Sequence, residues 1–406
     1  TVAPLEAAKP KTTAWEVLAL VLGLSGLVGG VGLAALVALA LSLTPNRQGL
    51  DLVAVVTIFG LGLLGGPLVW EAAQALRGRA SFIWQANLRW LMVGGLLVVA
   101  SLACGQASLS LNLAPDVLIG LAQYFAVLGA AAFLLALTAG GWAGFSRLRA
   151  WGHFISGAWL AIVIAFAAEV ILIGLLAVAG LSLLSVVAPD EFDQLLGLFR
   201  AVQLTGDLER LSEFVLKPWV IVSTLVVAAG LLPALEELIK PLGVILMLRR
   251  RPTPMAAFLG GVLGGLGFAV VESLANLGAT REGWLALVTA RMGTMIMHGL
   301  TAGLVGWGWG QLAATRKPWR LLVSYLAAVA IHGLWNGAVV AVSFGSLPLL
   351  TPGVDVMQQI VPGLLVAVSA LIVLGLVLGG LAALGMIGYR LRKAETAVGA
   401  IHESPD

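Results

Sequence analysis

Ionisable and amide side chains occur at four places inside long apolar runs of this chain, all between residues 232 and 336. A charged residue at the middle of a membrane helix costs at least ~2.5–3.5 kcal/mol. Because four successive segments bear this cost, we expect their polar groups to converge on one site. In chain order the groups are residues 233–240 (PALEELIK), 267–272 (GFAVVE), Arg291 with His298, and 332–336 (HGLWN).

The adjacent carboxylates of Glu236 and Glu237 are the hardest of these groups to explain as structure. Lys240 follows at the spacing that lets it pair with either carboxylate on a helix. One cation leaves a surplus buried negative charge, so one carboxylate should face water. Pro233 and Pro241 bracket the motif, and we expect a kinked or broken helix beside a small aqueous cavity.

Two histidines are predicted to join these carboxylates. Counted from the basic ends of their spans, His298, His332 and Glu236 lie at similar depth in the membrane. A carboxylate near an imidazole can activate water as a general base. A second imidazole and an amide could donate hydrogen bonds to an oxyanion. The predicted catalytic residues are Glu236, Glu237, His298, His332 and Asn336.

Three further residues are predicted to support this site. Glu272 and Arg291 lie nearer the outer surface and can form a structural ion pair, and Lys240 can neutralise a catalytic carboxylate. Single residues also have plain structural explanations, because a lone membrane histidine can bond a neighbouring carbonyl. Asn336 could likewise link two helices.

The same residue types leave a metal mechanism open. Two glutamates and two histidines could bind a divalent cation, Zn²⁺ being the best match to these ligands. The chain has no His-Glu-x-x-His motif, so the sequence favours glutamate-activated water without a cofactor, with zinc as the alternative. A serine mechanism is weaker, because Ser273, Ser324 and Ser369 have no nucleophile-elbow context.

Composition predicts that transmembrane helices position these residues. The chain has 406 residues, of which 60% are hydrophobic and 11% charged, whereas a soluble domain is about 45–50% apolar and ~25% charged. We expect an all-α, polytopic transmembrane helical bundle of about ten spans. They cover residues 15–43, 52–76, 88–111, 116–142, 155–187, 219–247, 255–279, 283–313, 320–345 and 360–388.

Charge in the connections predicts the orientation of the spans. Cations concentrate before the first span and after each even-numbered one, so both termini are predicted cytoplasmic. Short basic clusters and a net charge of +3 indicate no nucleic-acid surface. The cations that define the cytoplasmic side are Lys9, Lys11, Arg77, Arg79, Arg89, Arg147, Arg149, Arg249, Arg250, Arg251, Arg316, Lys317, Arg320, Arg390, Arg392 and Lys393.

The distribution of polar groups predicts four regions. Residues 1–188 form a five-span membrane region of unknown role, and 189–217 form an extracytoplasmic amphipathic loop with one or two short helices. Residues 218–345 form the four-helix catalytic core. Residues 346–406 hold the last span and a basic cytoplasmic tail.

The four motifs together resemble the PrsW family of intramembrane proteases. That family shares a clan with the type II CAAX prenyl endopeptidases and the bacteriocin-processing proteins. The resemblance rests on Pro233 with Glu236-Glu237-x-x-Lys240, on residues 267–272, on Arg291 with His298, and on His332-Gly-x-Trp335-Asn336. It covers about 105 residues, with one motif on each of four successive predicted helices.

The resemblance implies a glutamate-type endopeptidase in a bacterial cytoplasmic membrane that cuts a membrane-anchored protein. Typical members make the first cut in an anti-sigma factor and thereby release a stress-response sigma factor. An ion- or proton-coupled transporter could use the same intramembrane charges and broken helices. Such transporters often have two repeated halves, but the polar motifs are not repeated in the first five spans. This difference favours the protease. The sequence specifies neither the substrate nor the oligomeric state.

Overall fold

The computed structural model describes residues 14–43, 50–111, 116–205, 214, 216–277, 283–350 and 356–403. The chain forms two compact units that alternate along the sequence. The first unit comprises residues 1–162, 240–325 and 380–406. The second comprises residues 163–239 and 326–379. The predicted cytoplasmic cations Lys9 and Lys11 lie outside the described residues.

Helices form nearly all of the first unit. Its only described strands are β1 (Ile83–Trp84) and β2 (Phe145–Ser146), which pair antiparallel with Ile83 opposite Ser146. A π-helical turn, Ser156–Ala161, follows α6. The helices are α1 (Ala14–Leu43), α2 (Leu50–Leu63), α3 (Gly65–Leu76), α4 (Leu88–Ser110), α5 (Asp116–Ala139), α6 (Arg147–Ile155), α12 (Leu242–Met247), α13 (Pro254–Leu277) and α14 (Trp284–Thr315).

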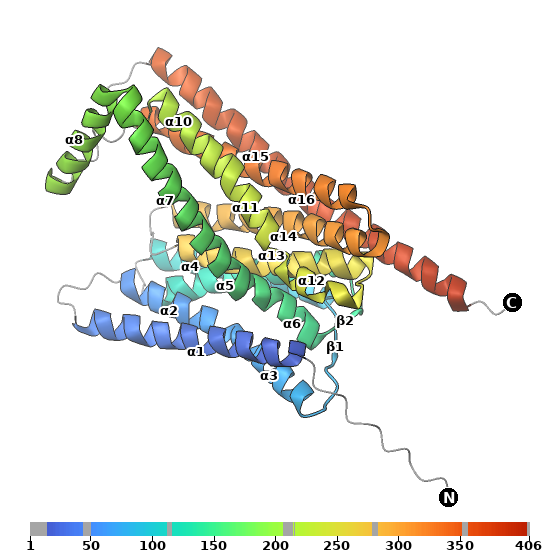
Figure 1. The fold of residues 1–406 in the computed structure, drawn as a ribbon. Coiled ribbons are helices and arrows are strands. Elements are labelled where there is room, and N and C mark those ends of the chain that lie inside the picture. The colour runs from blue at the N-terminus through green and yellow to red at the C-terminus, as the bar shows by residue number, and fades with distance from the viewer. Residues whose placement is uncertain are drawn as a thin grey trace, which may run out of the picture. The chain divides into compact units, whose positions relative to one another are not determined.

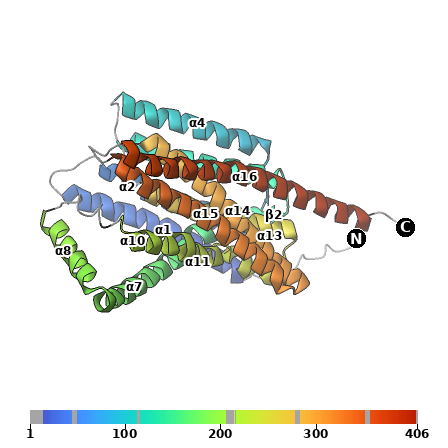
Figure 2. The ribbon, with the colours of Figure 1, turned by 90° about the horizontal axis from the view of Figure 1, so that it is seen from above.

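Helix α13 is the core of this unit. It lies along α14 and also contacts α5, α6 and the π-helical turn, while α1 packs on α2 and α3 (Figure 1). Helix α4 packs on α5, and Figure 2 shows α4 along its length. In the most apolar part of α13, 83% of the residues are buried, against 17% in α4. A helix buried on all sides suits the placement of ionisable groups, whereas α4 offers its side chains to lipid.

Glycines allow α13 to approach α14 closely. A Cβ on Gly261 would lie 2.2 Å from the carbonyl oxygen of Ala302, and one on Gly265 would lie 2.3 Å from that of His298. No side chain fits at such distances, so glycine is required at both positions. This small-residue packing is typical of membrane helices, where close van der Waals contact replaces the hydrophobic effect.

The second unit is also helical. It contains α8 (Pro189–Thr205), α10 (Pro218–Leu225), a π-helical turn at Val226–Leu231, and α11 (Leu232–Ile239). Nearly all of α7 (Ile162–Val187) belongs to it. Two long helices, α15 (Pro318–Leu350) and α16 (Val356–Glu403), contribute one segment to each unit.

The break predicted at the proline-bracketed motif is confirmed. Helix α11 ends at Ile239, Lys240 and Pro241 form a turn, and α12 begins at Leu242. Pro241 cannot donate a backbone hydrogen bond, and its ring disfavours a helical conformation at Lys240. In the loop predicted at 189–217, residues Pro189–Thr205 form helix α8, and residues 206–213 and 215 lie outside the described part.

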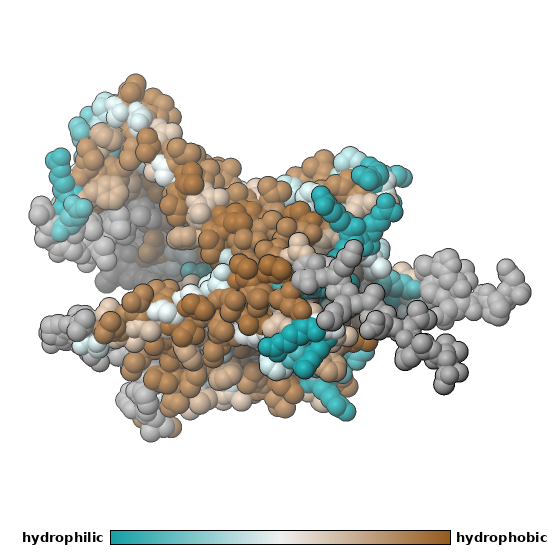
Figure 3. All heavy atoms as spheres, turned by 60° about the horizontal axis from the view of Figure 1, so that its bottom comes forward, coloured by the Kyte–Doolittle hydropathy of each residue, from teal (hydrophilic) through white to brown (hydrophobic). Residues whose placement is uncertain are grey.

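The polytopic all-α fold is confirmed. Among the described residues, nine helical stretches are long and apolar enough to cross a membrane. They correspond to nine of the ten predicted spans; the remaining predicted span, 283–313, coincides with α14, a 32-residue helix outside that set of nine. Apolar side chains cover most of the visible face in Figure 3, and a group of hydrophilic side chains lies at its right.

Replacing Gly265 by alanine should destabilise the protein, because the new Cβ would meet the His298 carbonyl at 2.3 Å. We expect a loss of about 1–3 kcal/mol from overpacking. Gly174 is the matched control, because a Cβ there meets nothing within 4 Å. Alanine is the better helix former, so Gly174→Ala should be neutral or stabilising. Thermal unfolding of the purified variants in micelles measures both effects, and equal unfolding temperatures would contradict the packing argument.

Candidate active site

The predicted site residues of the second unit form a carboxylate–histidine cluster, consisting of Glu236, Glu237 and His332. Glu237 is fully buried and His332 is 2% exposed. Nδ1 of His332 lies 2.8 Å from Oε1 of Glu237, and Nε2 lies 4.0 Å from Oε2 of Glu236. The Glu236 side chain is 12% exposed, so it is the more accessible of the two carboxylates.

The contact with Glu237 assigns the tautomer of His332. An ionised carboxylate only accepts hydrogen bonds, so Nδ1 of His332 carries a hydrogen and donates it to Glu237. In the neutral imidazole, Nε2 is then the basic nitrogen, on the side of Glu236. A carboxylate that holds a histidine in this way also raises the basicity of the other ring nitrogen.

Helix α15 reaches this cluster because of Gly333. A Cβ there would lie 2.2 Å from the carbonyl oxygen of Ala229, within the π-helical turn before α11. One turn along α15, Nδ2 of Asn336 donates to the carbonyl oxygen of Ala228 at 2.8 Å. A π-helical turn loosens the backbone hydrogen-bond ladder, and such turns are frequent at functional sites. Asn336 therefore links the two helices, one of the two roles expected from the sequence.

The predicted site residues of the first unit form a lysine–histidine cluster, consisting of Lys240, Glu272, Arg291 and His298. Lys240 and His298 are 0% and 1% exposed. Nζ of Lys240 lies 2.6 Å from Nδ1 of His298, and Nε2 of His298 lies 2.7 Å from Oε2 of Glu272. The other oxygen of Glu272 binds Nη2 of Arg291 at 2.8 Å.

In the lysine–histidine cluster, the donor groups determine the direction of the hydrogen bonds made by His298. An ammonium group only donates, so Nδ1 of His298 accepts from Lys240 and Nε2 carries the hydrogen that is donated to Glu272. The ring of Phe268 lies against the lysine, with Nζ 4.9 Å from its centroid. Lys240 on one side and Glu272 on the other thus hold the imidazole in one orientation, and Arg291 in turn holds Glu272.

Several of these contacts were predictable and others were not. The Arg291–Glu272 ion pair was expected from their depth, and it is present. The contacts of His298 with Lys240 and Glu272 were not expected, although a count of residues along two antiparallel neighbouring helices could have suggested the second. The convergence of the two clusters on one site stays a prediction.

Sequence reasoning also missed His153, a buried residue of α6. It packs against Phe145, with ring centroids 5.2 Å apart, and Nδ1 has no hydrogen-bond partner among the described atoms. A lone histidine beside two arginines of a predicted cytoplasmic connection carries no motif, so no pattern in the sequence marks it.

A model of the PrsW family, described as an intramembrane metalloprotease family, matches residues 192–374. The matched region contains all eight predicted site residues, and it confirms the family resemblance. The match supports a membrane-embedded peptidase that acts on a membrane protein in a lipid bilayer. Comparison with curated proteins and with solved structures found no match.

Removing Glu272 should destabilise the first unit, because Arg291 and His298 would each lose a charged partner. Glu272 is 27% exposed, so solvent offsets part of the loss, and we expect about 1–3 kcal/mol for Glu272→Ala. Asn276→Ala removes only an exposed hydrogen bond to the same carboxylate and should cost less than about 0.5 kcal/mol. Thermal unfolding compares the stability of the two variants. A larger loss of stability in Asn276→Ala than in Glu272→Ala would contradict the role assigned to Glu272.

Proposed function

We propose that this protein is an intramembrane endopeptidase in which Glu236 activates a water molecule to hydrolyse a peptide bond of a membrane-anchored protein. The observation that carries the proposal is the carboxylate–histidine cluster, a buried glutamate holding a histidine beside a second, more accessible glutamate. The PrsW match over the same residues supports the peptidase class and favours hydrolysis over transport.

Burial assigns different roles to the two carboxylates. Glu237 is fully buried and bonded to His332, so it is proposed to position the imidazole. Glu236 is proposed as the general base, because a base must be reachable by water and substrate. Sequence reasoning left these roles interchangeable, and the exposed fraction of each side chain supports one assignment over the other.

The proposed reaction is a hydrolysis in two stages. Glu236 accepts a proton from water while the water oxygen forms a bond to the carbonyl carbon, which produces a tetrahedral oxyanion. Collapse of this intermediate breaks the carbon–nitrogen bond, and the proton passes to the leaving amine. The products are a carboxylate and an amine, with one water consumed.

Asn336 is proposed to help hold the oxyanion. Its amide nitrogen carries two hydrogens, and one is donated to the Ala228 carbonyl. This bond fixes the amide plane, so the second N–H has a defined direction from which to donate. A preorganised donor of this kind stabilises negative charge that develops in the transition state.

The two clusters are proposed to belong to one site. Chain connectivity supports this, because Lys240 directly follows α11 and lies three residues after Glu237. His298 and its partner Lys240 would then place an imidazole and an ammonium beside the carboxylates. The sequence-based depth count, which puts Glu236, His298 and His332 at one level, supports the same arrangement.

The donor set also fits a metal ion, in agreement with the family description. Glu236, His298 and His332 are the side chains proposed to hold Zn²⁺. His332 offers a basic Nε2 whose ring is held by Glu237, the arrangement that metal-binding histidines commonly have. Bound zinc would polarise the scissile carbonyl and lower the pKa of a bound water. Nδ1 of His298 accepts from Lys240 and Nε2 donates to Glu272, so this residue could bind zinc only by giving up one of those bonds.

Cleavage should depend on the carboxylate–histidine cluster. We expect Glu236→Gln, Glu237→Gln and His332→Ala each to lower the cleavage rate by about 10²–10⁴, the range of general acid–base catalysis. Ser273→Ala is the control, because this buried serine neighbours Glu272 and its hydroxyl has no partner among the described atoms. The assay follows loss of an extracytoplasmic tag from co-expressed single-span proteins. Variants of the cluster that cut as fast as wild type would overturn the proposal.

Zinc content separates the two hydrolytic mechanisms. If zinc is part of the site, elemental analysis should find about one zinc per chain in the wild type and much less in His332→Ala, since each ligand contributes to affinity. Asn276→Ala serves as the control and should keep the wild-type content. Wild-type protein that cleaves its substrate without stoichiometric metal would leave glutamate-activated water as the mechanism.

A further inference from the structure

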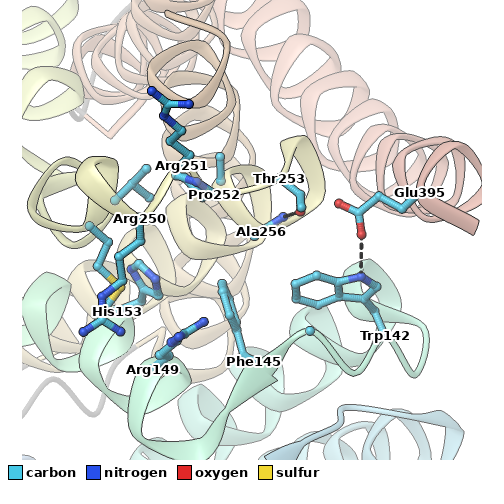
Figure 4. Close-up of a pocket in the computed structure, with 14 residues that line it drawn as sticks. Trp142, Phe145, Arg149, His153, Arg250, Arg251, Pro252, Thr253, Ala256 and Glu395 are labelled. Carbon is cyan, nitrogen blue, oxygen red and sulfur yellow. Dashed lines mark hydrogen bonds between the residues drawn. The ribbon is translucent and has the colours of Figure 1, made fainter. Parts of the chain in front are cut away.

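A cavity of about 340 Å³ lies in the first unit, and its lining contains no residue of the two clusters described above. Residues of the β2–α6 region, of the turn between α12 and α13, and of the C-terminal part of α16 form its wall (Figure 4). Two of these segments are basic connections that the positive-inside pattern predicts to be cytoplasmic. The cavity is large enough for a small ligand group.

Two guanidinium groups dominate the charge of this cavity. Arg149 and Arg250 extend toward the same part of it, beside His153, whereas Arg251 points away from them (Figure 4). No described carboxylate forms an ion pair with Arg149 or Arg250. Both also line an adjoining cavity of about 370 Å³ that contains a third cation, Arg79, and the acid Glu16. Two neighbouring like charges are stabilised when an anion lies between them.

A buried histidine supplies a further polar group. His153 lines the same cavity, is 3% exposed, and has no hydrogen-bond partner at Nδ1 among the described atoms. Its Nδ1 lies beside α12, where a Cβ added at Gly243 would be 2.8 Å away. The ring of His153 therefore adds a polar side chain to a wall that already carries two arginines.

On the opposite side of the cavity, hydrogen-bond donors already bind a carboxylate of the chain itself. The carboxylate of Glu395, on α16, accepts hydrogen bonds from the indole N–H of Trp142 at 2.9 Å and from the backbone N–H of Met255 at 3.3 Å. Met255 belongs to the first turn of α13, where backbone N–H groups and the helix dipole favour anions. The N–H groups on this side of the cavity are therefore suited to binding an anion, and the carboxylate of Glu395 occupies them.

We propose that this cavity binds the phosphoryl group of an anionic ligand through Arg149 and Arg250, with the negative charge of Glu395 limiting its affinity. Arginine suits this task because its planar donors match phosphate oxygens. A phosphoryl group reaches the cavity either on the headgroup of an anionic phospholipid or on a soluble phosphate compound. Basic pockets between transmembrane helices on the cytoplasmic side are suited to such headgroups.

The test uses the full chain in nanodiscs and has two arms. In phosphatidylcholine nanodiscs, inorganic phosphate is titrated and binding is followed by the shift in unfolding temperature. In the second arm, phosphatidylglycerol is added to the lipid and its retention is measured by native mass spectrometry. Arg250→Gln should weaken binding about tenfold, the effect of losing one charge-assisted hydrogen bond. Arg77→Gln, an exposed arginine outside the cavity, is the matched control and should bind as wild type does.

A second variant guards against misfolding as an explanation. Glu395→Gln removes the competing negative charge and should tighten binding several-fold, a gain that a damaged protein would not show. Binding confined to the lipid arm identifies the headgroup as the source, and binding confined to the phosphate arm identifies a soluble ligand. The proposal is overturned if wild type binds in neither arm, if Arg250→Gln matches Arg77→Gln, or if Glu395→Gln fails to tighten binding.

Discussion

The hydrogen bond between Glu237 and His332 is the contact on which the second unit depends. It places a fully buried carboxylate in an apolar helix, which is tolerable only with a close partner. That requirement brings α15 against the turn before α11, and Gly333 removes the side chain that would prevent the approach. Asn336 then satisfies a backbone carbonyl of the same turn. One buried charge thus accounts for a glycine, an amide and the pairing of two helices.

The first unit solves the same problem with a different set of groups. Lys240 is as buried as Glu237, and its Nζ contacts an imidazole, which Glu272 holds from the other side. Arg291 adds a second cation to Glu272, so positive charge exceeds negative charge within the cluster. In the second unit the excess has the opposite sign, with two carboxylates around one histidine.

The sequence predicted much of the fold because membrane helices must satisfy their backbone internally and span a fixed thickness. Apolar length therefore located the helices, and Pro241 located the break after Ile239. The partners of His298 were not predictable in this way. The contact with Glu272 depends on the register of α13 against α14, which the approach of Gly265 to a backbone carbonyl sets, and the contact with Lys240 depends on the turn after α11. His153 left no signal for a different reason, because a lone histidine beside two arginines carries no motif.

The glycines of α13 also restrict which positions of this protein can accept substitutions during evolution. A methyl group at Gly261 or Gly265 would collide with main-chain atoms of α14, and main-chain atoms cannot be exchanged for smaller ones. These positions can therefore change only if the whole helix pair moves. Helix α4 faces few neighbours and can exchange one apolar side chain for another. Homologues should accordingly diverge quickly along α4 and slowly along one face of α13, even at glycines that touch no substrate.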